Sequence, residues 1–371
     1  MNLVIDIPEA MYNISNVLVP SLQGYKCLTG GILYDFEMYT GGFCQSYPLQ
    51  KENSTKKCLR LWTNDVSRED NLQHIKEVAD YFQHKKPYYV VKYDYVDRAF
   101  RLNDGTVIPG VVMDWIEGDT LINYVKKNYR NSALMEQLAE SFHKMVNYFH
   151  YHGIAHGDLS GENIIVDNRG KLSLVDYDSF YVRGMARNIL QPTKGQGAYQ
   201  HPKRMFGDDR YLNKDMDNFS QQVIYLSLIA IAAKPSVFNE DSDCGLVFQE
   251  TELINENVFK ESATYRAISE IKDHRIHYLL DCLRTDLEKD LSQVRSLFTI
   301  LDLPEMPADE PEYEWEEHFS TPYSSRSLGK EEIATFHINK NYCPMCGTKY
   351  PSERSAFCPQ CGHPCEVKKS K

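Results

Sequence analysis

The stretch His156-Gly157-Asp158-Leu159-Ser160-Gly161-Glu162-Asn163, followed further along by Asp176-Tyr177-Asp178, decides the fold of this chain. The short spacing between Asp158 and Asn163 allows a single loop to present both side chains to one cleft. Residues 164–166 and 171–175 are mostly apolar and flank Asp-Asn-Arg-Gly at 167–170, which predicts a strand, a turn and a second strand. Such a hairpin returns Asp176 to the loop, so three oxygen-bearing side chains are expected to converge.

This cluster resembles the catalytic and metal-binding loops of the protein kinase fold, whose patterns are H-R-D-L-x-x-x-N and D-F-G. The resemblance implies that Asp158 positions the acceptor hydroxyl and that Asn163 and Asp176 bind magnesium. Phosphoryl transfer needs cations at the phosphate oxygens and a carboxylate beside the nucleophile, which is what these residue types supply. An H-G-D triplet alone would be weak evidence because Asp is common in turns, so the whole constellation carries the prediction.

Other segments follow the order of the protein kinase family. Residues 111–118, V-V-M-D-W-I-E-G, resemble a kinase hinge, which implies that Met113, Asp114 and Trp115 contact adenine. Residues 197–202 lie where kinases close the activation segment, and an apolar stripe at helical spacing precedes the catalytic loop, formed by Leu138, Phe142, Met145, Val146 and Phe149. We therefore expect an α+β, two-lobed kinase-like fold, with a small antiparallel β-sheet lobe and a large helical lobe.

The resemblance is sharper to a bacterial group of kinase-like proteins that carry H-G-D-L, L-V-D-Y-D and Y-Q-H-P. In that comparison Arg60 takes the place of the Lys that contacts the nucleotide phosphates, and its planar fork does not reproduce a compact ammonium. The predicted nucleotide-covering loop spans residues 39–47 and includes Gly41, Gly42 and Phe43. Glu77, on a helix predicted over residues 67–84, is a candidate partner of Arg60, but its position off the apolar stripe favours a solvated surface carboxylate.

The C-terminal region carries a second motif, the two knuckles C-P-M-C-G at 343–347 and C-P-Q-C-G at 358–362. Two such knuckles complete a tetrahedral thiolate site for zinc, with ligands Cys343, Cys346, Cys358 and Cys361. Disulfides are less favoured, since no signal peptide precedes the domain and the other cysteines show no framework spacing. A segment of about 25 residues buries too little apolar surface to fold alone, so metal binding is expected to fold it.

Charge limits the partners. The chain has 41 basic and 52 acidic residues and a net charge of −11, which disfavours binding of nucleic acid by the whole chain. The predicted ribbon is locally basic, so a protein or nucleic-acid partner of that module stays open.

The domain organisation follows from composition. We predict an N-terminal extension over residues 1–30, a kinase-like domain over 31–301, an acidic, proline-containing linker over 302–341 and a zinc ribbon over 342–366. The small lobe is expected to run to about 113 and the large lobe to begin at about 118. The longest apolar run, residues 223–233, is shorter than the ~20 residues that cross a bilayer. Because nothing marks export, a cytoplasmic bacterial protein is expected.

Strands are expected at residues 3–7, 31–39, 56–62, 87–96 and 106–113. The leading functional hypothesis is an ATP- and Mg²⁺-dependent Ser/Thr-type protein kinase acting on a protein substrate. The first alternative is a pseudokinase scaffold with weak or no nucleotide turnover, which Arg60 and Ser160 motivate, since Ser160 replaces a Lys that steadies the transferring phosphate. The second alternative is an adaptor that acts through the zinc ribbon.

Overall fold

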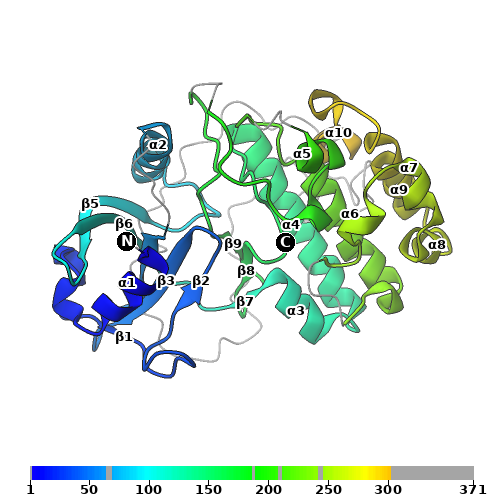
Figure 1. The fold of residues 1–371 in the computed structure, drawn as a ribbon. Helices are drawn as coiled ribbons and strands as arrows, with labels where there is room; N and C mark the ends of the chain where they lie inside the picture. The colour runs from blue at the N-terminus through cyan, green and yellow to red at the C-terminus, as the bar shows by residue number, and fades with distance from the viewer. Residues whose placement is uncertain (1, 64–68, 186–188, 208–210, 241–244, 302–371) are drawn as a thin grey trace, which may run out of the picture. The chain divides into compact units, whose positions relative to one another are not determined.

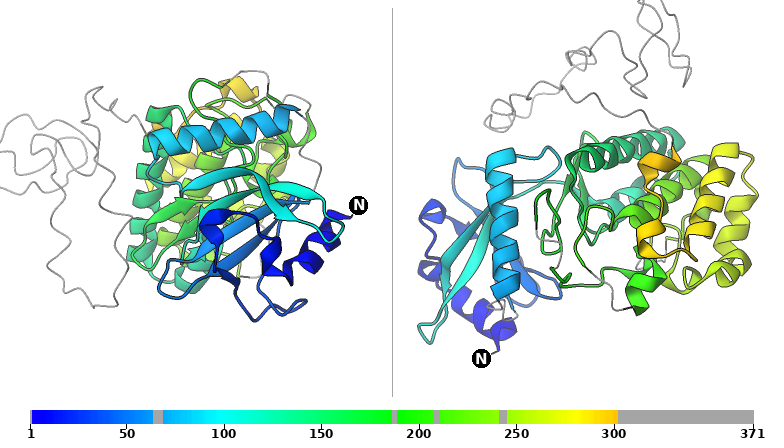
Figure 2. Two further views of the ribbon diagram at one scale, coloured as in Figure 1. Left: turned by 90° about the vertical axis from the view of Figure 1, so that its left-hand side faces the viewer. Right: turned by 90° about the horizontal axis from the view of Figure 1, so that it is seen from above.

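The structure, a computed structural model, describes residues 2–63, 69–185, 189–207, 211–240 and 245–301 (Figure 1). The predicted linker and the four cysteines of the predicted ribbon lie outside the described residues. Two lobes follow one another along the chain, a small lobe built on a β-sheet and a large lobe built mostly from helices (Figures 1 and 2).

The small lobe is a six-stranded antiparallel sheet in the order β1-β3-β4-β6-β5, with β2 paired to β3. Its strands are β1 Lys26–Cys27, β2 Tyr39–Thr40, β3 Cys44–Gln50, β4 Lys57–Trp62, β5 Tyr93–Arg101 and β6 Val107–Asp114. Helix α2, Glu69–Lys85, packs beside β5 (Figure 2). Strand β4 lies in the interior of the sheet between β3 and β6, and this register fixes the position of Arg60 opposite Ser46 and Val111.

The strands predicted at 56–62 and 106–113 are confirmed as β4 and β6. The strand predicted at 87–96 begins only at Tyr93, and the one at 31–39 is wrong except at its end, where Tyr39 opens β2. Strand β3 was missed because its first residues were assigned to the nucleotide-covering loop. Cys44 and Gln45 instead pair with Trp62 and Leu61 of β4.

Residues 2–30 contribute several buried side chains to the core of the small lobe. They form helix α1, Leu3–Met11, and the 3-10 helices η1, Ile14–Asn16, and η2, Pro20–Leu22. The strand predicted at residues 3–7 is wrong. Ile7, Ala10 and Met11 recur at helical spacing and are buried, whereas Val4 and Ile5 are exposed. A helix is favoured because it places the three buried side chains on one face.

The large lobe is organised around α6, Asn218–Ala233, which contacts α4, Ser132–His152, and α9, His274–Asp286 (Figure 1). Helix α6 is buried on nearly all sides, which explains why its sequence is apolar without a polar face. The predicted apolar stripe of α4 is buried, and Gly153, with φ +64°, ends this helix. In the part of the chain that the structure describes, no helix combines the length and apolarity needed to cross a membrane.

The remaining elements of the large lobe are short. A three-stranded sheet in the order β7-β8-β9 lies next to α3. The elements are β7 Asp119–Thr120, α3 Leu121–Asn128, β8 Ile164–Val166, β9 Leu172–Leu174, η3 Gly197–Tyr199, α5 Pro202–Phe206, η4 Pro235–Val237, η5 Glu250–Glu252, α7 Glu256–Glu261, α8 Ala263–Ser269, η6 Leu291–Gln293 and α10 Leu297–Ile300.

Asp286, at the end of α9, joins three parts of the large lobe. Its carboxylate is fully buried and accepts hydrogen bonds from Gln222 of α6 (2.8 Å) and from Arg295 (2.9 Å), and Lys289 lies 2.7 Å away. Burial alone would raise the pKa of Asp286, but these donors outweigh burial and hold the pKa below its usual value.

We expect Asp286→Ala to lower the free energy of unfolding by about 2 kcal/mol at pH 7, because it leaves the partly buried Arg295 and Lys289 without their carboxylate. The folded pKa lies below the unfolded one, so the contribution is complete above the unfolded pKa of 3.8 and is lost as pH falls through the folded value. Urea unfolding at pH 7 and at acid pH measures both effects.

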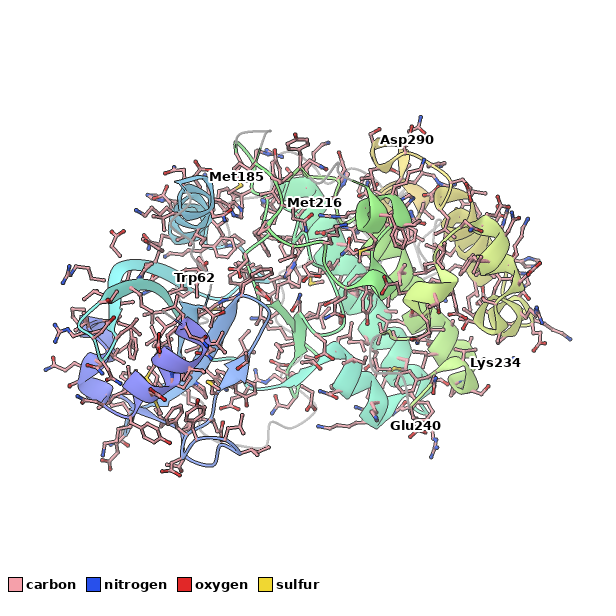
Figure 3. The ribbon with its side chains drawn as sticks, viewed as in Figure 1. Trp62, Met185, Met216, Lys234, Glu240 and Asp290 are labelled. Carbon is pink, nitrogen blue, oxygen red and sulfur yellow. The ribbon has the colours of Figure 1, made fainter. Side chains whose placement is uncertain are left out.

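The matched control is Asp290→Ala, since Asp290, labelled in Figure 3, is an exposed carboxylate that pairs with Lys203 at the surface. Its unfolding midpoint should equal that of the wild type. Equal losses for the two variants at pH 7 would contradict the role assigned to Asp286.

Candidate active site

The loop that carries Asp158 is held by Asp217, the residue just before α6. Asp217, which precedes α6, accepts hydrogen bonds from the backbone amides of His156 and Gly157, the latter at 2.8 Å. The His156 ring accepts from the Asp158 amide through Nδ1 (3.2 Å), which leaves Nε2 to donate to the Val175 carbonyl (2.8 Å). The loop is thus tied both to the central helix of the large lobe and to the segment that leads to Asp176.

The hairpin places the backbone of Asn163 next to Val175, the residue before Asp176. Strands β8 and β9 pair antiparallel with Ile164 opposite Leu174, so the predicted strand, turn and strand are confirmed. The Asn163 side-chain nitrogen donates to the Asp158 carbonyl (2.8 Å), and the Val175 amide donates to the Asn163 carbonyl (3.0 Å). Because the amide nitrogen of Asn163 is used inside the loop, its side-chain oxygen is the atom that can bind a cation.

Arg60 crosses from the small lobe to the large lobe. Its Nη2 lies 2.6 Å from Asp176 Oδ1 and 2.6 Å from Asp178 Oδ2, and the residue is 4% exposed. Glu77 is not among the carboxylates that pair with Arg60 in the described residues. One of its oxygens accepts from Gln73 of its own helix (2.9 Å), and the other is enclosed without a hydrogen-bond partner among the described residues.

Asp176 has a left-handed backbone, with φ +66°. Asp tolerates this conformation better than most residues, but it remains a cost that the surrounding contacts must offset. Residues with such a backbone are common at functional sites. Here the residue follows strand β9, and its side chain pairs with Arg60.

A cavity of about 30 Å³ lies where these residues meet. Both lobes contribute to its wall, which is lined by Gly42, Phe43, Cys44, Arg60, Asp158, Asp176, Asp178, Ser179 and Thr193. The structure therefore brings together five of the residues singled out in the sequence: Gly42, Phe43, Arg60, Asp158 and Asp176.

The other predicted site residues are not in the lining of this cavity: Gly41, Met113, Asp114, Trp115 and Asn163. The Gly41 amide donates to the Cys44 carbonyl (2.9 Å) and closes the turn between β2 and β3. Met113 and Asp114 end β6, where Asp114 pairs with Lys57. The Trp115 amide donates to the Lys56 carbonyl (3.2 Å), so this backbone group already has a partner. Adenine contacts by Met113, Asp114 and Trp115 stay predictions.

The carboxylates of the cavity differ in their pKa. Burial and the charge of Asp176 raise the pKa of Asp158, and burial, again with Asp176, raises that of Asp178. Partial burial would also raise the pKa of Asp176, but the Arg60 charge and hydrogen bond outweigh it and lower the pKa. Three carboxyl groups and one guanidinium line the cavity, and two of the three, Asp176 and Asp178, pair with the guanidinium. Acidic groups therefore outnumber basic ones in the lining, which favours cations.

The described residues contain no group of three or more His, Cys, Asp or Glu side chains arranged to hold a metal ion. A magnesium ion needs fewer protein ligands, because it usually keeps waters and substrate phosphates and takes one or two carboxylates. Asn163 and Asp176, with their oxygen donors, fit that demand.

Reasoning from the sequence alone missed several cavity residues. Asp178 was part of the quoted motif but received no role, and Ser179 and Thr193 were not singled out. The signal for Asp178 was available, since D-Y-D places an acid where D-F-G has Gly. The hydrogen bonds from the Asp217 carboxylate to the loop amides were also not predicted.

Comparison with known proteins identifies the family. The model of the protein kinase domain matches residues 40–299, more than half of the chain. The chain belongs to the protein kinase domain family. The antiparallel small lobe and the helical large lobe agree with the two-lobed fold expected from the sequence.

Curated relatives are Ser/Thr protein kinases. The chain is 28% identical over 217 residues to cyclin-dependent kinase C-2 of Oryza sativa subsp. japonica, an alignment that covers 50% of this chain and 40% of the relative. It is 27% identical over 123 residues to the probable serine/threonine-protein kinase PknB of Lactococcus lactis (33% and 18%), and 24% identical over 123 residues to the serine/threonine-protein kinase KIN4 of Saccharomyces cerevisiae (33% and 15%).

These alignments span less than half the length of the relatives. Because the relatives come from a plant, a bacterium and a yeast, a bacterial origin of this chain stays a prediction.

Gly157 stands where the kinase pattern has Arg, and the structure gives a physical reason. Its φ is +81°, and a Cβ placed there would lie 2.4 Å from the Ser179 carbonyl oxygen. The loop therefore leaves no room for a side chain at this position.

We expect Gly157→Ala to lower the free energy of unfolding by about 2 kcal/mol or more, since the left-handed backbone and the overlap with Ser179 add. Gly170→Ala is the matched control, because Gly170 has φ +78° and open space around it. It should show the backbone cost alone, about 1 kcal/mol. Chemical denaturation measures both, and equal losses would show that the contact with Ser179 costs nothing.

Proposed function

We propose that this chain is an ATP- and Mg²⁺-dependent protein kinase of the Ser/Thr type. The observation that carries the proposal is the meeting of Asp158 and Asp176 with Arg60 at one cavity, with Asn163 hydrogen-bonded to the same loop. The family membership and the Ser/Thr kinase relatives support it. The substrate would be a hydroxyl-bearing side chain of a protein.

Each residue has a role in this proposal. Asp158 accepts a hydrogen bond from the acceptor hydroxyl and orients it for attack. The side-chain oxygens of Asn163 and Asp176 hold magnesium, which, when bound, neutralises charge on the phosphate oxygens. Arg60 supplies a permanent positive charge to the phosphate end of the cleft. The turn at Gly41, Gly42 and Phe43 covers the phosphates, and residues 113–115 contact adenine.

A second candidate is a pseudokinase scaffold, and one observation favours it. The cavity volume of about 30 Å³ is far below the roughly 300 Å³ or more of ordinary small-molecule pockets. Arg60 is also held by two carboxylates. Nucleotide binding must therefore move the Gly42–Phe43 turn away from the large lobe and separate Arg60 from one of its partners.

We expect the full chain to transfer the γ-phosphate of ATP to itself or to a generic protein acceptor in the presence of Mg²⁺. Asp158→Ala and Asp176→Ala should each lower the rate by roughly a hundredfold or more, since each removes a group needed in the transition state. Incorporation of labelled phosphate measures the rate. Asp167→Ala, in the turn between β8 and β9 and outside the cavity, is the matched control.

Equal rates for the wild type and Asp176→Ala would rule out this mechanism. ATP binding separates the kinase from the scaffold, because a ligand that binds only the folded state raises the unfolding midpoint. No shift at millimolar ATP with Mg²⁺ would favour the scaffold.

We also propose that residues 342–366 bind zinc through Cys343, Cys346, Cys358 and Cys361, and that this ribbon docks a protein or nucleic-acid partner. The two C-P-x-C-G knuckles support it, since their spacing suits a tetrahedral thiolate site.

The purified chain should contain about one zinc ion per molecule, as expected for one closed four-thiolate site. The double variant Cys343→Ser/Cys358→Ser should lose it, whereas Cys282→Ser, which changes a buried free thiol of α9, should keep it. Elemental analysis measures the metal. Zinc retained in the double variant would refute the site.

A further inference from the structure

Arg60 is a buried cation whose environment differs from a simple ion pair. Two carboxylates share one of its nitrogens, with Asp176 Oδ1 and Asp178 Oδ2 each 2.6 Å from Nη2. Its Nε is enclosed and has no hydrogen-bond partner among the described residues. The guanidinium therefore does not use its bidentate geometry, and the two N–H groups of Nη2 serve two different carboxylates.

The two carboxylates are not equivalent. The Asp178 side chain is 14% exposed and the Asp176 side chain is 40% exposed. Asp178 has a second donor, since Trp62 Nε1, on the same strand as Arg60, lies 3.4 Å from Asp178 Oδ1 (Trp62 is labelled in Figure 3). Asp178 is thus the enclosed anion, and Asp176 is the one that solvent and ligands can reach.

The charges show why two anions are present. A buried guanidinium with no counterion would be strongly destabilising, so at least one carboxylate must stay with Arg60. If Asp176 were the only partner, its use as a metal ligand would strip Arg60 of its counterion. No oxygen of Glu77 takes that place, since one accepts from Gln73 and the other has no hydrogen-bond partner among the described residues.

We propose that Asp178 is a positioning residue that serves as the lasting counterion of Arg60 and so frees Asp176 to bind Mg²⁺. The inference rests on the proposed kinase function and assigns a role to a residue outside the expected catalytic set. In this arrangement Asp178, the third residue of D-Y-D, neutralises the charge of Arg60. Asp176 then exchanges Arg60 for the metal without leaving a buried charge unpaired.

The first test concerns the counterion and needs no nucleotide. Asp178→Asn should lower the thermal unfolding midpoint of the full chain, and the loss should largely vanish in the Arg60→Gln background, where no cation needs neutralising. If Asp178→Asn alone does not fold, the double variant should fold again. An equal loss in both backgrounds, or a double variant that stays unfolded, would overturn the proposal.

The second test concerns the metal. Asp178→Asn leaves Asp176 as the sole partner of Arg60, so half-maximal phosphotransfer should require roughly tenfold more Mg²⁺, while kcat at saturating Mg²⁺ stays within about threefold. Asp178→Glu, which keeps the charge, should restore the wild-type requirement in part. A merely structural role would lower the amount of active protein without changing the Mg²⁺ requirement.

The control is Glu77→Gln, because Glu77 lies on α2 and accepts a hydrogen bond only from Gln73 of its own helix in the described residues. Its Mg²⁺ requirement should match the wild type. An unchanged Mg²⁺ requirement in Asp178→Asn would overturn the inference and leave the kinase function standing. A wild type without any turnover would count against the kinase function, and the unfolding test would then decide the counterion role by itself.

Discussion

The ion pair between a strand of the small lobe and the turn after β9 is the constraint on which the rest of the site depends. Arg60 is almost fully buried, and removing a guanidinium from water costs several kcal/mol unless carboxylates and hydrogen bonds compensate for it. Its partners lie 116 and 118 residues away in the sequence, on the other lobe. Each lobe therefore has a charged group that is stable only when the other lobe faces it.

The large lobe supplies the fixed part of this arrangement. Asp217 holds two amides of the catalytic loop, and the His156 ring links that loop to Val175. The two loop amides are bonded to the carboxylate of the residue that precedes the buried helix α6, and the His156 ring is bonded to the backbone just after β9. The loop around Asp158 is therefore held in place by the large lobe itself. The small lobe adds a cation, Arg60, and the turn at Gly42 and Phe43, which complete the wall of the cavity.

Local signals made the centre of the site predictable. The hairpin between Asn163 and Asp176 is encoded by a short turn between two apolar runs, so its two ends had to meet. The N-terminal helix was not predictable in this way, because a short apolar run such as residues 3–7 suits a strand or a helix until its packing partner is known. Asp178 was missed for a related reason, since its partner Arg60 is separated from it by 118 residues.

Two departures from the kinase pattern, Arg60 for Lys and Asp178 for Gly, are best understood together. An added acid in the turn brings a negative charge into an enclosed place and raises the pKa of its own carboxyl, so it needs a cation that never loses its proton. Arg meets that need better than Lys, whose ammonium deprotonates when buried without enough anions. In the proposed mechanism, phosphate oxygens that approach Arg60 would displace at least one carboxylate, and Asp176 is the more exposed of the two.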